Sequence, residues 1–396
     1  MHPLASWLAR RLPFHYGWLI LATVCCAGFA RQAPAVATLS IFVEPMTAEF
    51  GWSRTAISGA VSLGGVLAAV VAPFLGPRLD AKGARVVLCL AVLATAVSTM
   101  LLSLTGSLVV FYLLFCFARM NFAAPFDLAI HGAVANWFVA RRARAVSIAT
   151  LAQMAGLVTL PLIAQAAISG GGWRTGWLVV GFAVLLVGLP PVWFLMVRRP
   201  EDLGLAPESG RAGEGRAPMV EPAFTRAQAL RTPAFWLLAL FTLAVYPVQA
   251  GVSLHQAPHL IERGLDASIA ASVVATFSAV SALVALGYGF WPRRLPLNLA
   301  LVATGLALGS SALAMREIDG PGSAYLSAAL FGVGIAGLIT VLPLAWANYF
   351  GRASFGAIRG IALSIQVLAQ ASGPLLSGVM RDLTGDYALS LLCLGV

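Results

Sequence analysis

Charged side chains are scarce in this sequence of 396 residues. Asp, Glu, Lys and Arg together make up 10% of it, and hydrophobic residues make up 60%. An ordinary soluble domain contains about 25% charged residues. This composition excludes a soluble enzyme.

Cysteines and catalytic motifs are also sparse. The five cysteines lie in apolar segments without the spacing of metal ligands, so we interpret them as packing residues. The sequence shows no Gly-rich phosphate loop followed by Lys-Ser or Lys-Thr, no metal-ligand cluster and no nucleophile elbow. We therefore expect no cofactor, no metal and no enzymatic activity, and ATP-driven transport would require a partner subunit.

Long apolar segments, in contrast, follow one another along the whole chain. A transmembrane helix needs about 20 apolar residues. We predict twelve spans, at 16–44, 53–77, 84–105, 107–138, 144–169, 174–197, 233–261, 266–290, 295–315, 322–350, 356–380 and from 387 onward. The last segment provides only about 15 Å of helix for a core of about 30 Å, so we expect the twelfth helix to be truncated.

A polar stretch rich in Gly, Pro, Arg and Glu divides six spans from six. It covers 198–232 and is interpreted as a cytoplasmic linker between six-helix bundles at 1–197 and 233–396. A weak repeat agrees with this division, because Leu-Ala-Gln-Met-Ala-Gly at 151–156 matches Leu-Ala-Gln-Ala-Ser-Gly at 368–373. Repeated halves that rock around a midplane substrate site are typical of secondary transporters. The sequence thus predicts an all-α membrane protein with two pseudo-symmetric halves.

The excess of basic residues is distributed unevenly. The net charge of +10 would suggest a nucleic-acid partner in a soluble protein. If the N-terminus is cytoplasmic, most basic residues of this chain, Arg352 and Arg359 among them, fall in the cytoplasmic segments. The outer loops hold only Arg54, Arg174, Arg263, Arg316 and Arg381. The positive-inside rule then predicts a protein of the plasma membrane, a bacterial inner membrane, with both termini cytoplasmic and no nucleic-acid partner. No small-residue cleavage site ends the first apolar stretch, so we interpret it as a membrane helix rather than a signal peptide.

A loop motif follows the second predicted span. Residues 76–85 read Gly-Pro-Arg-Leu-Asp-Ala-Lys-Gly-Ala-Arg, with Gly76, Asp80, Gly83 and Arg85 at the defining positions. Asp80 can cap the next helix, or pair with Arg85 and neighbouring helices, and so latch the cytoplasmic side. An ordinary basic loop is the alternative. The motif resembles the loop signature of the major facilitator superfamily, which implies a fold of six plus six helices. The equivalent place in the second half, 291–294, lacks the acid.

Other motifs resemble the bacterial monocarboxylate and oxalate–formate transporter branch of that superfamily. They are Tyr-Gly-Trp at 16–18, Glu-Phe-Gly-Trp-Ser-Arg at 49–54, Arg-Pro-Glu-Asp-Leu-Gly-Leu at 199–205, and Pro233 followed by Phe235 and Trp236. In that branch an arginine of the eighth helix holds the carboxylate, yet 266–290 contains no basic residue. Arginines in the first and fourth helices also resemble the anion:cation symporters, which widens the expected substrate to small organic anions.

Two arginines lie inside predicted spans. A charge at the bilayer centre costs about 2.5–3.5 kcal/mol, so an intramembrane arginine indicates a functional site. Arg31 in the first span and Arg119 in the fourth both come out near mid-depth, and Pro34 and Pro125 interrupt the same stretches. We predict that the two guanidiniums bind an organic anion, since their planar forks match a carboxylate. Alternatively, Arg119 resembles the superfamily's fourth-helix arginine, which bonds helix one and tunes proton movement.

One carboxylate also lies inside a span. Asp127 follows Arg119 by eight residues and precedes His131 by four. A buried carboxylate near an arginine and a histidine can bind and release a proton, which makes Asp127 and His131 candidates for proton coupling. A static ion pair of Asp127 with arginine or histidine is the equal alternative.

Polar residues in other spans complete the candidate substrate site. Tyr246, His255 and Gln256 lie in the seventh span, and Gln153 and Gln370 occupy matching places in the repeat. Structural roles, such as hydrogen bonds between helices, are the alternative for His255 and for both repeat glutamines. Asn121 lies about 200° around the helix from Arg119, which favours helix packing or a different cavity wall.

Together these features predict a secondary transporter of a small organic anion, a carboxylate, that works as a monomer by alternating access. Proton symport and exchange against a counter-anion both remain open. The alternatives are a drug/proton antiporter, which two cavity arginines disfavour by repelling cationic drugs, and a non-transporting membrane sensor.

Overall fold

The computed structural model describes residues 3–208, 221–290 and 296–395. Within them the chain forms fifteen α-helices, two short 3-10 helices and a single isolated bridge between Phe138 and Glu208. Nine of these helices are long and apolar enough to cross a membrane. The segment 291–294 and the middle of the expected linker, 209–220, lie outside the described residues.

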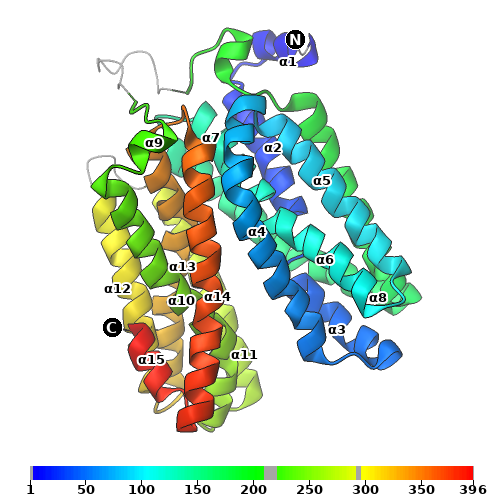
Figure 1. Cartoon of the computed structure of the whole chain (residues 1–396), viewed down its shortest axis with the longest axis vertical. Coiled ribbons are helices and arrows are strands. Elements are labelled where there is room, and N and C mark those ends of the chain that lie inside the picture. Colours follow the sequence, from blue (N-terminus) through cyan, green and yellow to red (C-terminus); the bar gives the residue numbers. More distant parts are fainter. Residues whose placement is uncertain (1–2, 209–220, 291–295, 396) are drawn as a thin grey trace. The chain divides into compact units, whose positions relative to one another are not determined.

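The chain divides into two compact units, and in each the long helices run side by side (Figure 1). The first unit comprises 1–226 together with 350–364, and the second comprises 227–349 together with 365–396. The first unit contains α1 (Pro3–Arg11), α2 (Gly17–Ala30), α3 (Val36–Phe50), α4 (Arg54–Lys82), α5 (Ala84–Leu101), η1 (Leu102–Leu104), α6 (Leu108–Ala123), α7 (Pro125–Trp137), α8 (Arg142–Leu195) and η2 (Pro200–Leu203). After the short α9 (Arg226–Ala229), the chain forms α10 (Pro233–Glu262), α11 (Ala267–Gly289), α12 (Leu297–Arg316), α13 (Pro321–Phe350), α14 (Phe355–Thr384) and α15 (Ala388–Gly395). The part of α14 up to Ser364 belongs to the first unit.

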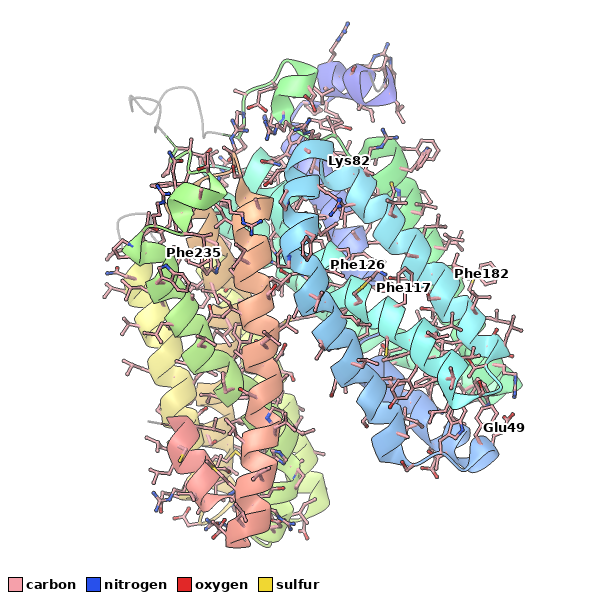
Figure 2. All side chains as sticks on the ribbon, in the orientation of Figure 1. Glu49, Lys82, Phe117, Phe126, Phe182 and Phe235 are labelled. Carbon is pink, nitrogen blue, oxygen red and sulfur yellow. The ribbon has the colours of Figure 1, made fainter. Side chains whose placement is uncertain are left out.

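Large apolar side chains cover the outside of the helices. Phe182 projects outward from α8 (Figure 2) and is 52% exposed, whereas Phe126 on α7 is fully buried. An apolar surface of this extent would be unstable in water but suits contact with lipid tails. The chain is an integral membrane protein with multiple spans.

Two predicted spans, 16–44 and 107–138, contain a break in the helix near the prolines that the sequence places there. In the first, α2 ends at Ala30 and α3 begins at Val36, and in the second, α6 and α7 are separated at Ala124. Each break precedes or contains a proline, which disfavours helical backbone at the residue before it. The breaks free backbone carbonyl groups beside both intramembrane arginines.

The spans predicted at 144–169 and 174–197 both lie within α8. Its backbone is non-helical at Gly171 and Gly172, and Gly172 has φ of 79°, a conformation that favours glycine. Two helices therefore meet at this pair of glycines, as the two separate spans predict.

Glycines allow the helices of the first unit to approach closely where the arginines lie. A Cβ on Gly28 would come within 2.8 Å of Gln153 Cγ, and one on Gly156 within 2.8 Å of the Phe29 carbonyl oxygen. A Cβ on Gly64 would lie 2.6 Å from Arg119 Cβ. The close packing of α2 on α8, and of α4 on α6, sets the positions from which the arginine side chains extend.

The first turns of α14 pack equally closely on α4. A Cβ on Gly76 would overlap the carbonyl oxygen of Gly356, and one on Gly360 would come within 2.5 Å of the Ala72 carbonyl oxygen. The Ser364 hydroxyl donates to the carbonyl of Ala69. This crossing brings the side chain of Arg359 into the first unit.

Candidate functional site

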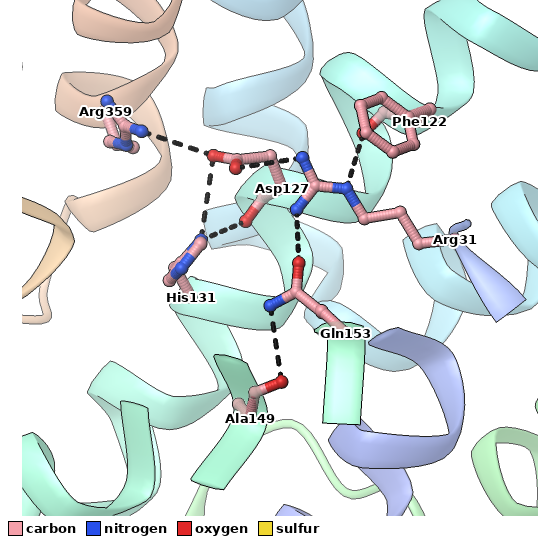
Figure 3. A network of polar contacts seen from close by, with 7 residues as sticks. All are labelled: Arg31, Phe122, Asp127, His131, Ala149, Gln153 and Arg359. Carbon is pink, nitrogen blue, oxygen red and sulfur yellow. Dashed lines mark hydrogen bonds and ion pairs between the residues drawn. The ribbon is translucent and has the colours of Figure 1, made fainter. Parts of the chain in front are cut away.

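A buried carboxylate shared by two guanidiniums lies within the first unit (Figure 3). Asp127, in the first turn of α7, has Oδ1 3.3 Å from Arg31 Nη2 and Oδ2 3.4 Å from Arg359 Nη2. The side chains of Asp127 and Arg359 are only 7% and 2% exposed. The carboxylate therefore has two cationic partners from two different helical segments.

Arg31 occupies the break after α2 and is held by three neighbouring groups. Its Nε donates to the Phe122 carbonyl at 2.9 Å and its Nη1 to Gln153 Oε1 at 2.7 Å, in addition to the contact with Asp127. Gln153 Nε2 donates in turn to the Ala149 carbonyl, which orients the amide (Figure 3). In this structure Gln153 therefore accepts an interhelical hydrogen bond from Arg31.

Arg119 lies near Arg31 but has a different environment. Its Nη1 donates to the carbonyl of Pro34 in the first break, at 3.3 Å. The guanidinium carbons of Arg119 and Arg31 lie 4.2 and 4.5 Å from the centroid of the same ring, that of Phe122. Among the described residues no carboxylate pairs with Arg119, and its buried Nε has no hydrogen-bond acceptor. An enclosed guanidinium without a counter-charge is unfavourable unless an anion joins it.

His131 completes the environment of Asp127. Its Nδ1 lies 2.9 Å from the Asp127 carbonyl oxygen and 3.6 Å from Asp127 Oδ2. Both alternatives for this pair therefore have a structural basis: the ion pairs are present in this conformation, and a histidine nitrogen is within reach of the carboxylate.

Arg359 is the residue that sequence reasoning missed. We counted it with the cytoplasmic charges, whereas it is fully buried in α14 and paired with Asp127. A signal was available, because Arg359 falls within the predicted span 356–380 and Gly356 and Gly360 flank it. Small residues on either side of a charged one allow a close approach to the neighbouring helix.

The predicted latch residues divide into two pairs. Asp80 Oδ1 accepts from the Gly356 N–H and Oδ2 from the Ala357 N–H, both at 2.8 Å, so Asp80 caps the N-terminus of α14. Gly76 lies one turn earlier at the crossing with α14. Gly83, at φ of 84°, separates α4 from α5, and the Arg85 guanidinium lies over the ring of Trp193 at 5.4 Å.

Acidic residues of the linker form further ion pairs in the first unit. Arg352 Nη2 donates to Glu201 at 2.6 Å, and Glu221 contacts both Arg352 and Arg142. Burial disfavours the Glu201 carboxylate, but the hydrogen bond from Arg352 lowers its pKa overall. These pairs fasten both ends of the linker to the first unit.

The other predicted site residues do not join the Asp127 network. Asn121 Nδ2 donates to the Phe117 carbonyl of its own helix. In the second unit, Gln370 donates to Gln249 Oε1 at 2.9 Å, and His255 contacts the ring of Tyr387 at 4.9 Å. Tyr246 and Gln256 are buried in α10. Gln256 Oε1 has no donor within the part of the chain that the structure describes.

Comparisons with known proteins agree with this architecture. Residues 20–374 match the family described as Major Facilitator Superfamily. Monocarboxylate transporter 11 of Mus musculus is 28% identical over 333 residues, 80% of this chain and 71% of the relative. The membrane sensor protein UhpC of Salmonella typhimurium is 27% identical over 342 residues, 80% of this chain and 75% of the relative. Among solved structures, that of the proton:xylose symporter XylE matches with a TM-score of 0.74 at 15% identity, covering 96% of this chain and 93% of that one.

We expect Asp80→Ala to loosen the first turn of α14, because it removes both acceptors of the Gly356 and Ala357 N–H groups. Loss of a helix cap costs about 1 kcal/mol, so amide exchange in this turn should accelerate roughly fivefold. Hydrogen exchange followed by mass spectrometry measures this, with the exposed Asp202→Ala as a matched control. Unchanged exchange at the start of α14 would contradict the capping role.

Proposed function

We propose that this chain, which belongs to the Major Facilitator Superfamily, is a transporter of a small organic anion, a carboxylate, and works by alternating access. The similarity to a monocarboxylate transporter supports a carboxylate substrate. The plasma membrane, with both termini on the cytoplasmic side, remains the location that the distribution of basic residues favours.

The observation that carries the proposal is the half-buried Arg119 guanidinium, whose Nε is shielded from solvent and has no hydrogen-bond acceptor among the described residues. Within the described residues it has no carboxylate partner, and it shares the Phe122 ring with Arg31. A substrate carboxylate would supply the missing counter-charge and satisfy N–H groups that protein acceptors leave unbonded. The same guanidiniums oppose a cationic substrate, which disfavours the drug/proton antiporter.

The remaining predicted residues take supporting roles in this proposal. Gln153 orients Arg31 through its 2.7 Å hydrogen bond. Tyr246, His255, Gln256 and Gln370 remain candidates for substrate contacts, and the lone Oε1 of buried Gln256 could accept a substrate hydroxyl. Asn121 is the weakest candidate, because its side chain bonds its own helix.

Asp127 and His131 are the groups we propose for proton coupling. Two guanidiniums contact Asp127, and we propose that proton binding at this carboxylate accompanies a change in one of these contacts. His131 is the second candidate because its Nδ1 lies 3.6 Å from Asp127 Oδ2. Gly76 and Asp80 would govern the opening of the cytoplasmic side by controlling the hold of α4 on α14, and Gly83 and Arg85 would act at the turn from α4 to α5.

A membrane sensor is the second candidate function. The similarity to UhpC, a sensor protein, covers 80% of this chain and 75% of that relative, which is as extensive as the similarity to the transporter. A sensor would bind its ligand by the same anion site but would carry no flux, so binding and uptake measured on one preparation distinguish the two.

We expect the purified full-length protein to be stabilised against heat by particular members of a panel of monocarboxylates, dicarboxylates and aromatic acids. Arg119→Ala and Arg31→Ala should each weaken binding roughly 10- to 100-fold, the equivalent of about 1.5–3 kcal/mol for a hydrogen bond to a charged group. Arg316→Ala, at a half-exposed position outside the Asp127 network, is the matched control. Stabilisation by lipophilic cations and by no acid would instead favour the antiporter.

We expect an imposed pH gradient, acid outside, to accelerate uptake of the same acid into proteoliposomes. Asp127→Asn should abolish this acceleration but retain exchange of external for internal substrate, because the variant cannot bind the coupling proton. Tracer uptake with and without the gradient measures both. Uptake that responds to internal anions and not to the gradient would show exchange rather than proton symport.

A further inference from the structure

Asp127 occupies a place on Arg31 that a substrate carboxylate would take. We propose that Asp127 is an internal anion which the substrate displaces from Arg31, and that Arg359 is the positioning residue that receives the displaced carboxylate. This inference rests on the proposed anion site at Arg31 and Arg119. In this proposal Arg359 does not contact the substrate. It acts only by binding Asp127.

The geometry of Asp127 is that of a shared ligand. Its two oxygens lie 3.3 and 3.4 Å from Arg31 and Arg359, whereas a well-formed charge-assisted hydrogen bond measures about 2.7–2.9 Å. Neither guanidinium holds the carboxylate closely. A small rotation of the side chain can therefore strengthen one contact at the expense of the other.

Arg31 keeps its position without Asp127. Its bonds to the Phe122 carbonyl and to Gln153, at 2.9 and 2.7 Å, are the short ones, and both come from groups that are themselves held by helices. The contact with Asp127 is the longest of the three. Loss of Asp127 would leave a preorganised guanidinium fork facing the substrate.

The charge balance favours the exchange. Asp127 lies between two cations, Arg31 and Arg359, and Arg119 nearby has no carboxylate partner among the described residues. A monoanionic substrate on Arg119 and Arg31 would add the second negative charge. If Asp127 and a substrate carboxylate both contact Arg31, their negative charges repel each other. A rotation of the Asp127 side chain toward Arg359 would relieve this repulsion.

The exchange would also connect the substrate site to α14. Arg359 lies one turn beyond Gly356 and Ala357, which Asp80 caps, and Ser364 bonds the Ala69 carbonyl further along the same helix. A tighter Asp127 to Arg359 pair would add to these contacts and hold the start of α14 on the first unit. Substrate binding would then strengthen the latch instead of merely filling the site.

Opposite effects of two substitutions test this proposal. Asp127→Asn removes the internal competitor, so binding of lactate, succinate or benzoate, whichever binds the wild type, should tighten about tenfold. Arg359→Gln removes the alternative partner and leaves Asp127 on Arg31, so binding should weaken about tenfold. The double variant should bind as tightly as Asp127→Asn alone, because Arg359 acts only through Asp127. Isothermal titration of the full-length protein at one fixed salt concentration measures all four.

Two comparisons separate this role from a purely structural one. Arg359→Lys, which keeps the cation, should restore much of the affinity lost in Arg359→Gln, and Asp202→Asn should match the wild type. Equal weakening by Asp127→Asn and Arg359→Gln, or additive effects in the double variant, would overturn the inference while leaving the anion site intact. If no acid of the panel binds the wild type, the anion site itself is wrong.

Discussion

A cation buried inside a membrane protein needs a counter-charge, and this constraint accounts for the arrangement of the first unit. Arg31 and Arg359 meet it by sharing Asp127, and backbone carbonyls at Phe122 and Pro34 receive further N–H groups of Arg31 and Arg119. Removing one partner of such a pair leaves a buried charge uncompensated, which costs about 3–5 kcal/mol. Arg119 has no carboxylate partner within the described residues, so in this account an anionic ligand supplies its counter-charge.

The fold supplies the geometry that this charge network needs. Proline-induced breaks after Ala30 and at Ala124 release carbonyl groups at the depth of the arginines. Glycines at the contacts of α2 with α8 and of α4 with α14 let backbones approach closely, so side chains from separate helices reach one carboxylate. Prolines and glycines weaken an isolated helix, but here they position the side chains of the site.

Much of this could be predicted from the sequence, and the reasons differ by residue. The helical membrane fold was predicted from apolar runs and a loop motif, and the family and fold comparisons confirm it. Arg31, Arg119 and Asp127 stood out because ionisable residues within apolar spans are costly and rare. Arg359 did not, because it lies close to the predicted start of a span, where a few residues separate a loop charge from a buried one. The partners of Asp80, 276 and 277 positions away, depend on tertiary packing that no local pattern encodes.

The central claim, that a substrate carboxylate binds the arginines and takes the place of Asp127, is tested most directly by a structure with a bound acid. A bromine-labelled carboxylate that stabilises the protein can be located by its anomalous scattering. We predict its oxygens within hydrogen-bond distance of Arg119 and Arg31, with Asp127 on Arg359 alone. An acid bound elsewhere, with the Arg31 to Asp127 contact unchanged, would contradict the account.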